Sequence, residues 1–469
     1  MSALLPRVFV RDLGPFREVA IELRPLTVFV GKNSVGKSFL LYLIWLLESA
    51  YPDWSVLIQE AERRGAAELV SKIVRDIKQW RIPSTEFKQL VRMFVETLPQ
   101  AIATTLKNLL EKTFGIELSS IVRHGAESAS IIVEGRVSSI HFEIRRDGTI
   151  TASYVKYNPG LVEHYDLNIL PSGEVKVLHG GRELLLVSAP HVKTISEVDI
   201  LRVIMSVLTD YIVNAFGLVF ASGIPCALLV DGRAGVARTL FRPYVEPSIT
   251  KGLLYPDEYY LNLYRFLAET LGQTPASIRL ELAEELLREL GVEFRALREH
   301  GIWTLRVRTW TGHEMYLEYA PSGIREVAVM VLALTIQGFP IVIFIEEPEA
   351  HLHLKAQKYL AKLIAKSINV LGKHVILTTH SDYLIYVFTN LIALHKIKNR
   401  ARELGYSEDE VLSPDKVAVY LVKQEDTYAK VERLEVTENG IDESHFEEVI
   451  RELADERSRI FTYLQEVHA

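Results

Sequence analysis

The chain has 469 residues, of which 48% are hydrophobic and 24% are charged, an ordinary balance for a folded protein with two or three structural units. Its formal net charge of −7 excludes a surface that is basic throughout, although a local nucleic-acid groove is compatible with it. Cys226 is the single cysteine, which excludes an intramolecular disulfide and favours a reducing cytoplasm.

A glycine-rich loop follows the third of three short strands predicted at the start of the chain. Residues 31–38 complete the pattern G-x-x-x-x-G-K-[ST], with an apolar strand before them and an apolar helical run after them. Glycines let the backbone wrap tightly, so that N–H groups and the helix N-terminus point at nucleotide phosphates. Lys37 would bridge the β- and γ-phosphates, and the Ser38 hydroxyl would hold Mg²⁺. The predicted ATP-binding residues are Gly31, Lys32, Asn33, Ser34, Val35, Gly36, Lys37 and Ser38.

The middle of the chain changes its periodicity several times. Residues 54–111 have helical periodicity, and strand and turn signals dominate from there to residue 190. A long amphipathic helix is predicted over residues 194–216. Another helix is predicted over residues 275–290, because Thr274 suits its N-cap and Pro275 its first position.

One apolar stretch, at residues 327–345, approaches the length of a membrane span. Gln337-Gly338-Phe339-Pro340 interrupts it, so we predict a buried helix, a turn and a buried strand, and no membrane insertion. Residues 1–13 also lack the layout of a signal peptide, which again favours a cytoplasmic protein.

Paired carboxylates end this buried strand, in the run Glu346-Glu347-Pro348-Glu349. Phosphoryl transfer depends on a metal ion, a positioned water and charge stabilisation more than on covalent chemistry. We therefore assign Glu346 to Mg²⁺ and Glu347 to polarising the attacking water, as in a Walker B motif. An ordinary acidic turn after a strand is the alternative.

Two further motifs could contact phosphate. His380 follows an apolar strand over residues 375–378, and ligands of parallel sheets lie at such carboxyl ends, so His380 could hydrogen-bond a γ-phosphate. Ser322 and Gly323 open the helix that precedes the Walker B strand, where a second anion site could form. The alternatives are a structural histidine and a plain helix cap.

Taken together, these four motifs resemble the ABC-type ATPase heads of the SMC and RecF class, and especially the stand-alone AAA-family ATPases related to the OLD nucleases. The most specific piece is Glu-Glu-Pro-Glu-Ala-His-Leu-His at residues 346–353. The resemblance implies an α/β P-loop NTPase head with a mainly parallel sheet flanked by helices and an antiparallel β subdomain. The implied domains are a head formed by residues 1–50 and 218–436, an α+β insertion at 51–217, and a helical tail at 437–469, where Ser444 and Glu447 form a capping box.

The resemblance also implies a mechanism in which two subunits enclose two ATP molecules. Ser322 and Gly323 would then act in trans on the nucleotide bound by the partner's phosphate loop, and His380 would be the switch histidine. Glu349 and His351 would lie in the loop that crosses the dimer interface. His351 and His353 as metal ligands are a weaker alternative, because no third ligand is evident.

Three departures from the family pattern matter. The signature is Pro-Ser-Gly-Ile-Arg, which disfavours a transporter, and Glu346 stands where many relatives carry aspartate. No glutamine suits the loop that usually links the nucleotide to the insertion. The family also has a strand that ends near an arginine, which corresponds to Arg233 here.

The expected function is a slow, dimer-dependent ATPase that drives or gates a partner in DNA or RNA processing, repair or antiviral defence. The partner could be a separately encoded nuclease or other effector, since only about 90 residues follow His380, too few for a nuclease domain. The alternatives are the ATP-binding subunit of a transporter and a nucleotide-dependent scaffold without turnover.

Two basic clusters could contact nucleic acid or simply face solvent. They comprise Lys72, Arg75, Lys78 and Arg81, and Lys396, Lys398, Arg400 and Arg402.

Overall fold

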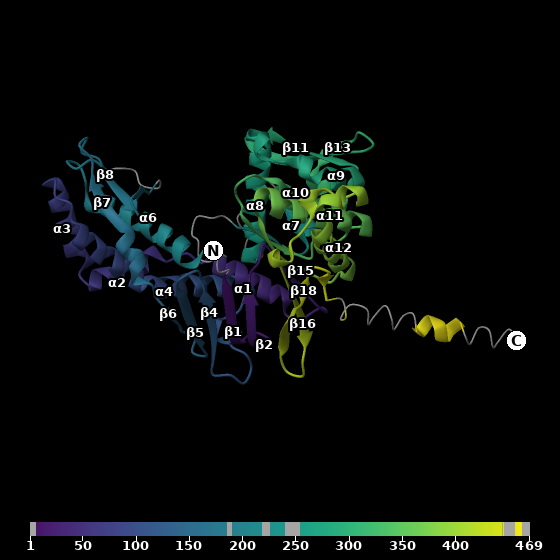
Figure 1. Ribbon diagram of the computed structural model, residues 1–469, viewed down its shortest axis with the longest axis horizontal. Coiled ribbons are helices and arrows are strands. Elements are labelled where there is room, and N and C mark those ends of the chain that lie inside the picture. Colours follow the sequence, from purple (N-terminus) through teal and green to yellow (C-terminus); the bar gives the residue numbers. More distant parts are fainter. Residues whose placement is uncertain are drawn as a thin grey trace.

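One mixed sheet of eleven strands runs through the molecule (Figure 1). The computed structural model describes residues 6–184, 190–217, 226–239, 254–442, 444 and 455–461, without the side chains of residues 237–239. The strand order is β10-β14-β15-β3-β16-β17-β2-β1-β4-β5-β6.

Half of this sheet is parallel. Its strands are β10 (Ala227–Leu229), β14 (Val342–Glu346), β15 (His374–Thr379), β3 (Leu26–Val30) and β16 (Val417–Gln424). The covering helices include α1 (Lys37–Ser49), α10 (Ser322–Thr335), α11 (Leu354–Leu371) and α12 (Asp382–Ala393). Every residue of β3 and β14 is buried, as expected for strands of a sheet with both faces covered. Because the strands are parallel, their carboxyl ends meet at one edge.

The other half of the sheet is mainly antiparallel. Its strands are β17 (Ala429–Leu434), β2 (Phe16–Glu22), β1 (Arg7–Leu13), β4 (Ser128–Glu134), β5 (Ser139–Arg145) and β6 (Ile150–Lys156). Apart from the single parallel contact of β17 with β2, all of these strands pair antiparallel. The combination of a parallel core flanked by helices and an antiparallel β subdomain confirms the predicted α/β fold class.

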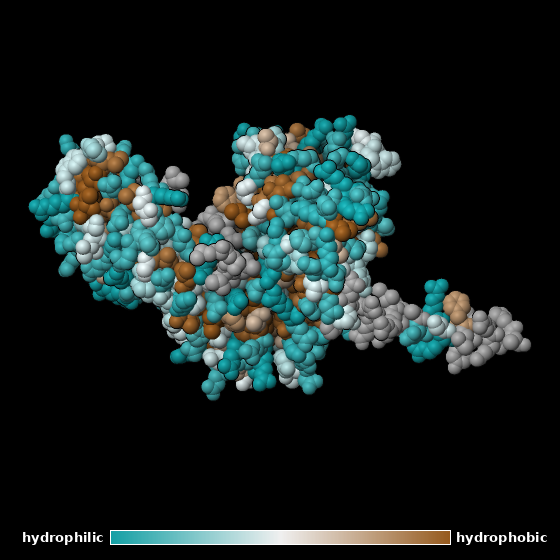
Figure 2. Space-filling view, viewed as in Figure 1, coloured by the Kyte–Doolittle hydropathy of each residue, from teal (hydrophilic) through white to brown (hydrophobic). Residues whose placement is uncertain are grey.

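The segment predicted as an insertion contributes to both parts of the molecule. Strands β4, β5 and β6 extend the large sheet, whereas the remainder projects beside it (Figure 1). The projecting elements are α2 (Trp54–Arg63), α3 (Ala66–Lys78), α4 (Ser84–Phe114), α6 (Glu197–Phe216), and the sheet β7 (Tyr165–Ile169), β8 (Val175–His179) and β9 (Arg182–Glu183). Apolar side chains gather on the surface of its outer end, near β7 and β8 (Figure 2).

A small α+β unit precedes the signature helix α10. It contains α8 (Tyr255–Gln273), α9 (Glu284–Leu290) and the sheet β11 (Val292–Glu299), β12 (Ile302–Thr309) and β13 (Glu314–Tyr316). The predicted helix over residues 275–290 is wrong, because only its end, α9, is α-helical. Ile278 instead pairs with Ile336 in an isolated β-bridge, and the Arg279 N–H donates to the Thr335 carbonyl at 2.8 Å. Tertiary pairing at Ile278 and Arg279 therefore interrupts the predicted α-helix, and short 3-10 helices form on either side of it.

The long apolar stretch divides as predicted, into the buried helix α10, a turn with a cis Phe339–Pro340 bond, and β14. Across the described ranges, no helix combines the length and apolar character of a membrane span. The start of the predicted tail forms the short hairpin β18 (Val436–Thr437) and β19 (Gly440–Ile441), and residues 455–461 are helical. Glu447, and with it the predicted capping box, lies outside the described residues.

Candidate functional site

The phosphate loop lies at the carboxyl end of the central strand β3, where two glycines permit two close approaches. At Gly31, with φ of 150°, a Cβ atom would lie 2.2 Å from the Val422 carbonyl oxygen of β16. At Gly36, with φ of 99°, a Cβ atom would lie 2.7 Å from the Phe16 ring. Glycine at these positions therefore lets the loop pass between β16 and the β1–β2 turn and lead directly into α1.

The remaining loop residues divide into buried and exposed groups. Val35 is buried beneath the loop, whereas Lys32, Asn33, Ser34 and Ser38 are exposed. Ser38 is the second residue of α1, so its hydroxyl lies at the helix N-terminus, beside the electropositive end of the backbone.

The Lys37 ammonium closes the loop upon itself. Its Nζ donates to the carbonyls of Gly31 at 2.9 Å and Lys32 at 2.8 Å. It also lies 3.3 Å from Nδ1 and 3.0 Å from Nε2 of His380. Burial lowers the pKa of Lys37, while the nearby carboxylates of Glu347, Glu349 and Glu346 oppose that effect.

Glu347 continues this chain of polar contacts. Its Oε1 lies 2.8 Å from His380 Nε2, so the histidine tautomer with its proton on Nε2 donates to Glu347 and leaves Nδ1 to accept from Lys37. Burial raises the pKa of Glu347, and the neighbouring His380 opposes the shift. Glu347 has φ of 41°, a left-handed conformation that is uncommon outside glycine and concentrates at functional sites.

Glu346 lies at the end of β14 and is only 4% exposed. Its Oε2 accepts hydrogen bonds from the Tyr42 hydroxyl and, at 2.9 Å, from the Asp231 N–H. Its Oε1 receives no hydrogen bond from the described residues. One carboxylate oxygen is therefore fixed, and the other is available as a hard ligand of the kind that Mg²⁺ prefers.

Glu346 and Ser38 thus form a donor set that fits Mg²⁺. The described residues contain no cluster of three or more His, Cys, Asp or Glu side chains suited to a metal. Mg²⁺ commonly binds through one or two protein oxygens, with phosphate and water oxygens completing its shell. His353, the weaker metal candidate, instead caps α11, where its Nδ1 accepts from the Lys355 N–H at 3.3 Å.

Glu349 organises the loop that carries His380, a role the sequence did not predict. Its Oε1 accepts from the Thr379 hydroxyl at 2.7 Å and from the N–H groups of His380 at 2.8 Å and Ser381 at 3.2 Å. An ionised carboxylate with three donors makes charge-assisted hydrogen bonds, which are stronger than neutral ones. Glu349 therefore fixes the backbone on which the His380 ring is mounted.

Arg233 is the second residue whose part in the site only the structure reveals. Its side chain is fully buried, and its Nη1 donates to the carbonyls of Glu346 at 2.6 Å and Val230 at 2.9 Å. Its Nη2 donates to the Glu347 carbonyl at 3.2 Å, and its Nε lies 2.9 Å from Glu326 Oε2 on α10. Arg233 thus joins the ends of β10 and β14 to the signature helix.

The predicted signature residues make no hydrogen bond with the phosphate loop of the same chain in the described structure. Ser322 is the first residue of α10. A Cβ atom on Gly323 would lie 2.8 Å from the His351 carbonyl oxygen, so α10 packs closely on the loop after the Walker B acids. The structure therefore brings together Lys37, His380, Glu346 and Glu347, and places Gly323 against the loop that follows these acids.

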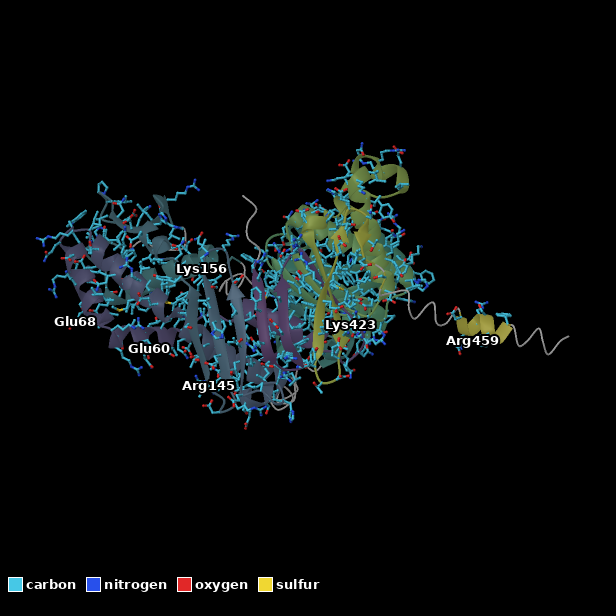
Figure 3. All side chains as sticks on the ribbon, turned by 60° about the horizontal axis from the view of Figure 1, so that its bottom comes forward. Glu60, Glu68, Arg145, Lys156, Lys423 and Arg459 are labelled. Atoms are coloured by element: carbon cyan, nitrogen blue, oxygen red, sulfur yellow. The ribbon has the colours of Figure 1, made fainter. Side chains whose placement is uncertain are left out.

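A cleft of about 1160 Å³ opens beside the phosphate loop. The loop and His380 line one part of it, and the end of β16 with the following turn lines another, from Leu421 to Asp426. Lys423 belongs to this β16 wall, beside the N-terminal strands (Figure 3). The cleft is large enough for a ligand of nucleotide size.

Comparison with known proteins identifies an ATPase domain in the second half of the chain. A family model described as an AAA ATPase domain matches residues 263–385, which include α10, the Walker B acids and His380. No match was found among curated proteins. The match agrees with the phosphate loop in identifying a P-loop ATPase and confirms the predicted resemblance at that level, whereas the relation to the OLD nucleases stays a prediction.

Three solved structures are similar to this chain at low identity. The first is the SmcHead bound to the C-winged helix domain of ScpA, with 12% identity and a TM-score of 0.43; the match covers 92% of this chain and 97% of that chain. The second is the Smc head domain with an extended coiled coil from Pyrococcus furiosus bound to the C-terminal domain of ScpA, with 11% identity, a TM-score of 0.42, and coverage of 97% of this chain and 100% of that chain. The third is the SMC head domain from Thermotoga maritima, with 11% identity, a TM-score of 0.38, and coverage of 92% of this chain and 98% of that chain.

Replacing Arg233 by methionine should lower the free energy of unfolding by about 3–5 kcal/mol, because it leaves the Glu326 carboxylate buried without its cation. Adding Glu326→Leu should recover part of that loss, since no buried charge then remains. Urea unfolding measures both effects. Arg288→Met is the control, because the exposed Arg288–Glu284 pair contributes only about 0.3–0.5 kcal/mol. A loss below about 1 kcal/mol in Arg233→Met would contradict this role.

Proposed function

We propose that this chain hydrolyses ATP to ADP and phosphate, slowly and as a dimer, and that the ATP-bound dimer drives or gates a partner. One observation carries the proposal. Lys37, His380 and Glu347 converge at the mouth of the phosphate loop, with separations of 2.8–3.3 Å between successive polar groups. These are the cation, the hydrogen-bond donor and the base-like carboxylate that cleavage of a phosphoanhydride requires.

Binding of ATP would reorganise this chain of contacts. The Lys37 ammonium now donates to loop carbonyls, which are neutral acceptors, and a triphosphate offers charged oxygens that make stronger hydrogen bonds. Lys37 would therefore turn to the β- and γ-phosphates. Mg²⁺ held by Ser38 and the free oxygen of Glu346 would neutralise phosphate charge.

The same exchange would prepare the carboxylate for hydrolysis. In this structure the His380 ring lies within hydrogen-bonding distance of Glu347. A γ-phosphate within reach of His380 would accept the hydrogen bond in place of Glu347. Glu347 would then accept from a water molecule and orient it in line with the γ-phosphorus. The water oxygen would form the new P–O bond, Glu347 would accept the proton that the water gives up, and ADP would leave with the electrons of the broken P–O bond.

Dimerisation would complete the site with Ser322 and Gly323 from the second subunit. Ser322 stands at the N-terminus of a 14-residue helix, which offers N–H groups and a favourable potential to an anion.

The two predicted basic clusters bear on the class of partner. Four residues of the predicted basic clusters lie near acidic side chains, which favours the alternative of solvated surfaces over nucleic-acid contact at these positions. The pairs are Lys72–Glu86, Lys396–Glu438, Arg400–Glu403 and Arg402–Glu408. A separately encoded nuclease or other effector in DNA or RNA processing is the partner we favour. A scaffold without turnover would not need Glu347 held beside His380.

The substitution Glu347→Gln should trap an ATP-bound dimer, because glutamine still fits the site but cannot act as the carboxylate that orients water. Size-exclusion chromatography with light scattering should show a dimer with ATP and Mg²⁺ and a monomer without nucleotide. Glu293→Gln, at an exposed carboxylate on β11, is the control. A monomer under both conditions would count against the shared site.

The substitution Lys37→Ala should weaken ATP binding by on the order of 100-fold or more, because it removes a buried cation aimed at the phosphates. Equilibrium binding of ATP by calorimetry measures the change. Lys430→Ala, which removes an exposed lysine of β17, should leave affinity within about twofold. Unchanged affinity in Lys37→Ala would refute the assignment of the loop.

The pH dependence of kcat/KM should be bell-shaped, because Glu347 must be deprotonated and Lys37 protonated in the free enzyme. Burial raises the pKa of Glu347, so activity should fall with acidification at a pH above the ordinary glutamate value of 4.5. Burial lowers the pKa of Lys37, so the alkaline limb should begin below the ordinary lysine value of 10.5. Residual activity of Lys37→Arg should lack the alkaline limb, because arginine stays protonated. An acid limb at or below 4.5 would contradict the assignment of Glu347.

A further inference from the structure

An aromatic cluster joins the projecting part of the insertion to the helix that follows the phosphate loop. Phe114 is the last residue of α4, and its ring stacks on Phe39 of α1 with centroids 4.6 Å apart and an interplanar angle of 19°. The same Phe114 ring meets Tyr42 of α1 edge-on, with centroids 6.5 Å apart. Such aromatic pairs add stabilisation beyond the area they bury.

Tyr42 connects this cluster to the acid assigned to the metal. Ser38 and Tyr42 are four residues apart on α1, so they lie on one face of the helix, and the Tyr42 hydroxyl donates to Glu346 Oε2. With the Asp231 N–H as second donor, Oε2 is held and Oε1 is left for another ligand.

The helix α4 is suited to carry a displacement away from the site. It has 31 residues, which corresponds to about 46 Å of helix that ends at Phe114, with Pro99 at its middle (Figure 1). It also contacts the chain just beyond α1, where the Ala101 carbonyl accepts from the Asp53 N–H at 3.1 Å. Both ends of α1 are thus tied to α4.

We propose that Tyr42 is a positioning residue for Glu346, and that its packing on Phe114 couples occupancy of the nucleotide site to α4 and the insertion. This inference rests on the proposed function, in which Glu346 contributes to the metal site. The aromatic contact thereby supplies the link to the insertion for which the sequence offers no glutamine. A shift of Glu346 when its free oxygen gains a ligand moves the Tyr42 hydroxyl, and the Tyr42 ring cannot move without the Phe114 ring on which it packs.

The test uses the full chain in the Glu347→Gln background, with Tyr42→Phe, Phe114→Leu and the control Tyr255→Phe. Tyr255 belongs to the same aromatic neighbourhood, stacked on Trp45, and its hydroxyl donates to no described residue. Calorimetry gives ATP affinity with and without Mg²⁺. Deuterium exchange at saturating ATP and Mg²⁺ gives protection of the phosphate loop and of the last turns of α4.

In the Glu347→Gln background alone, ATP with Mg²⁺ should protect both the loop and the end of α4. Tyr42→Phe should reduce the Mg²⁺-dependent gain in ATP affinity by on the order of tenfold, leave the Mg²⁺-free affinity unchanged, and remove protection at α4 while the loop stays protected. Phe114→Leu should lose the α4 protection with loop protection retained, and Tyr255→Phe should change neither quantity.

An unchanged Mg²⁺-dependent gain in Tyr42→Phe, or α4 protection that survives in both Tyr42→Phe and Phe114→Leu, would overturn the inference. If Tyr42→Phe fails to fold, the exchange pattern of Phe114→Leu decides the coupling. Failure of the proposed function looks different, because the phosphate loop of the Glu347→Gln background would then gain no protection from ATP.

Discussion

The parallel pairing of β14, β15 and β3 is the constraint on which the site depends. Its register places Glu346 opposite Thr378, and Thr379 opposite Val30, the last residue before the phosphate loop. A slip of one residue would turn every side chain of a strand to the opposite face of the sheet. The buried, branched apolar residues of these strands fix the register, and the register brings the lysine, the histidine and the carboxylates within hydrogen-bonding reach.

Charge at this edge of the sheet is unbalanced in a way that favours a cationic ligand. Three carboxylates, of Glu346, Glu347 and Glu349, lie near the Lys37 ammonium. The other buried cation at this edge, Arg233, is paired with Glu326. Partial burial strengthens their mutual repulsion relative to water, and each is held by donors from the protein: Tyr42 and a backbone N–H, His380, and the backbone of the His380 loop. The arrangement is stable as it stands, and a metal–nucleotide complex would bring both the missing positive charge and acceptors for Lys37.

Two helices link this edge of the sheet to other parts of the molecule. Arg233 and Glu326 attach it to α10, the helix whose N-terminus would face a second subunit. Tyr42 and Phe114 attach it to α4, which extends into the insertion. Because β4, β5 and β6 of the inserted segment also continue the large sheet, the two parts of the molecule share one hydrophobic core, and α4 does not depend on a flexible linker to remain in contact with the head.

The sequence by itself indicated the fold class, and it singled out residues 31–38, Glu346, Glu347 and His380 because each belongs to a short contiguous pattern. The catalytic roles of these residues stay predictions. The helix predicted over residues 275–290 failed for the opposite reason, since its capping signals at Thr274 and Pro275 were outweighed by pairing with residues nearly sixty positions away. Glu349, Arg233 and Tyr42 acquired their roles only in the tertiary structure. Arg233 finds Glu326 and Tyr42 finds Glu346 across 93 and 304 positions of sequence, and such contacts arise from strand order and helix packing, which no local pattern of residue types encodes.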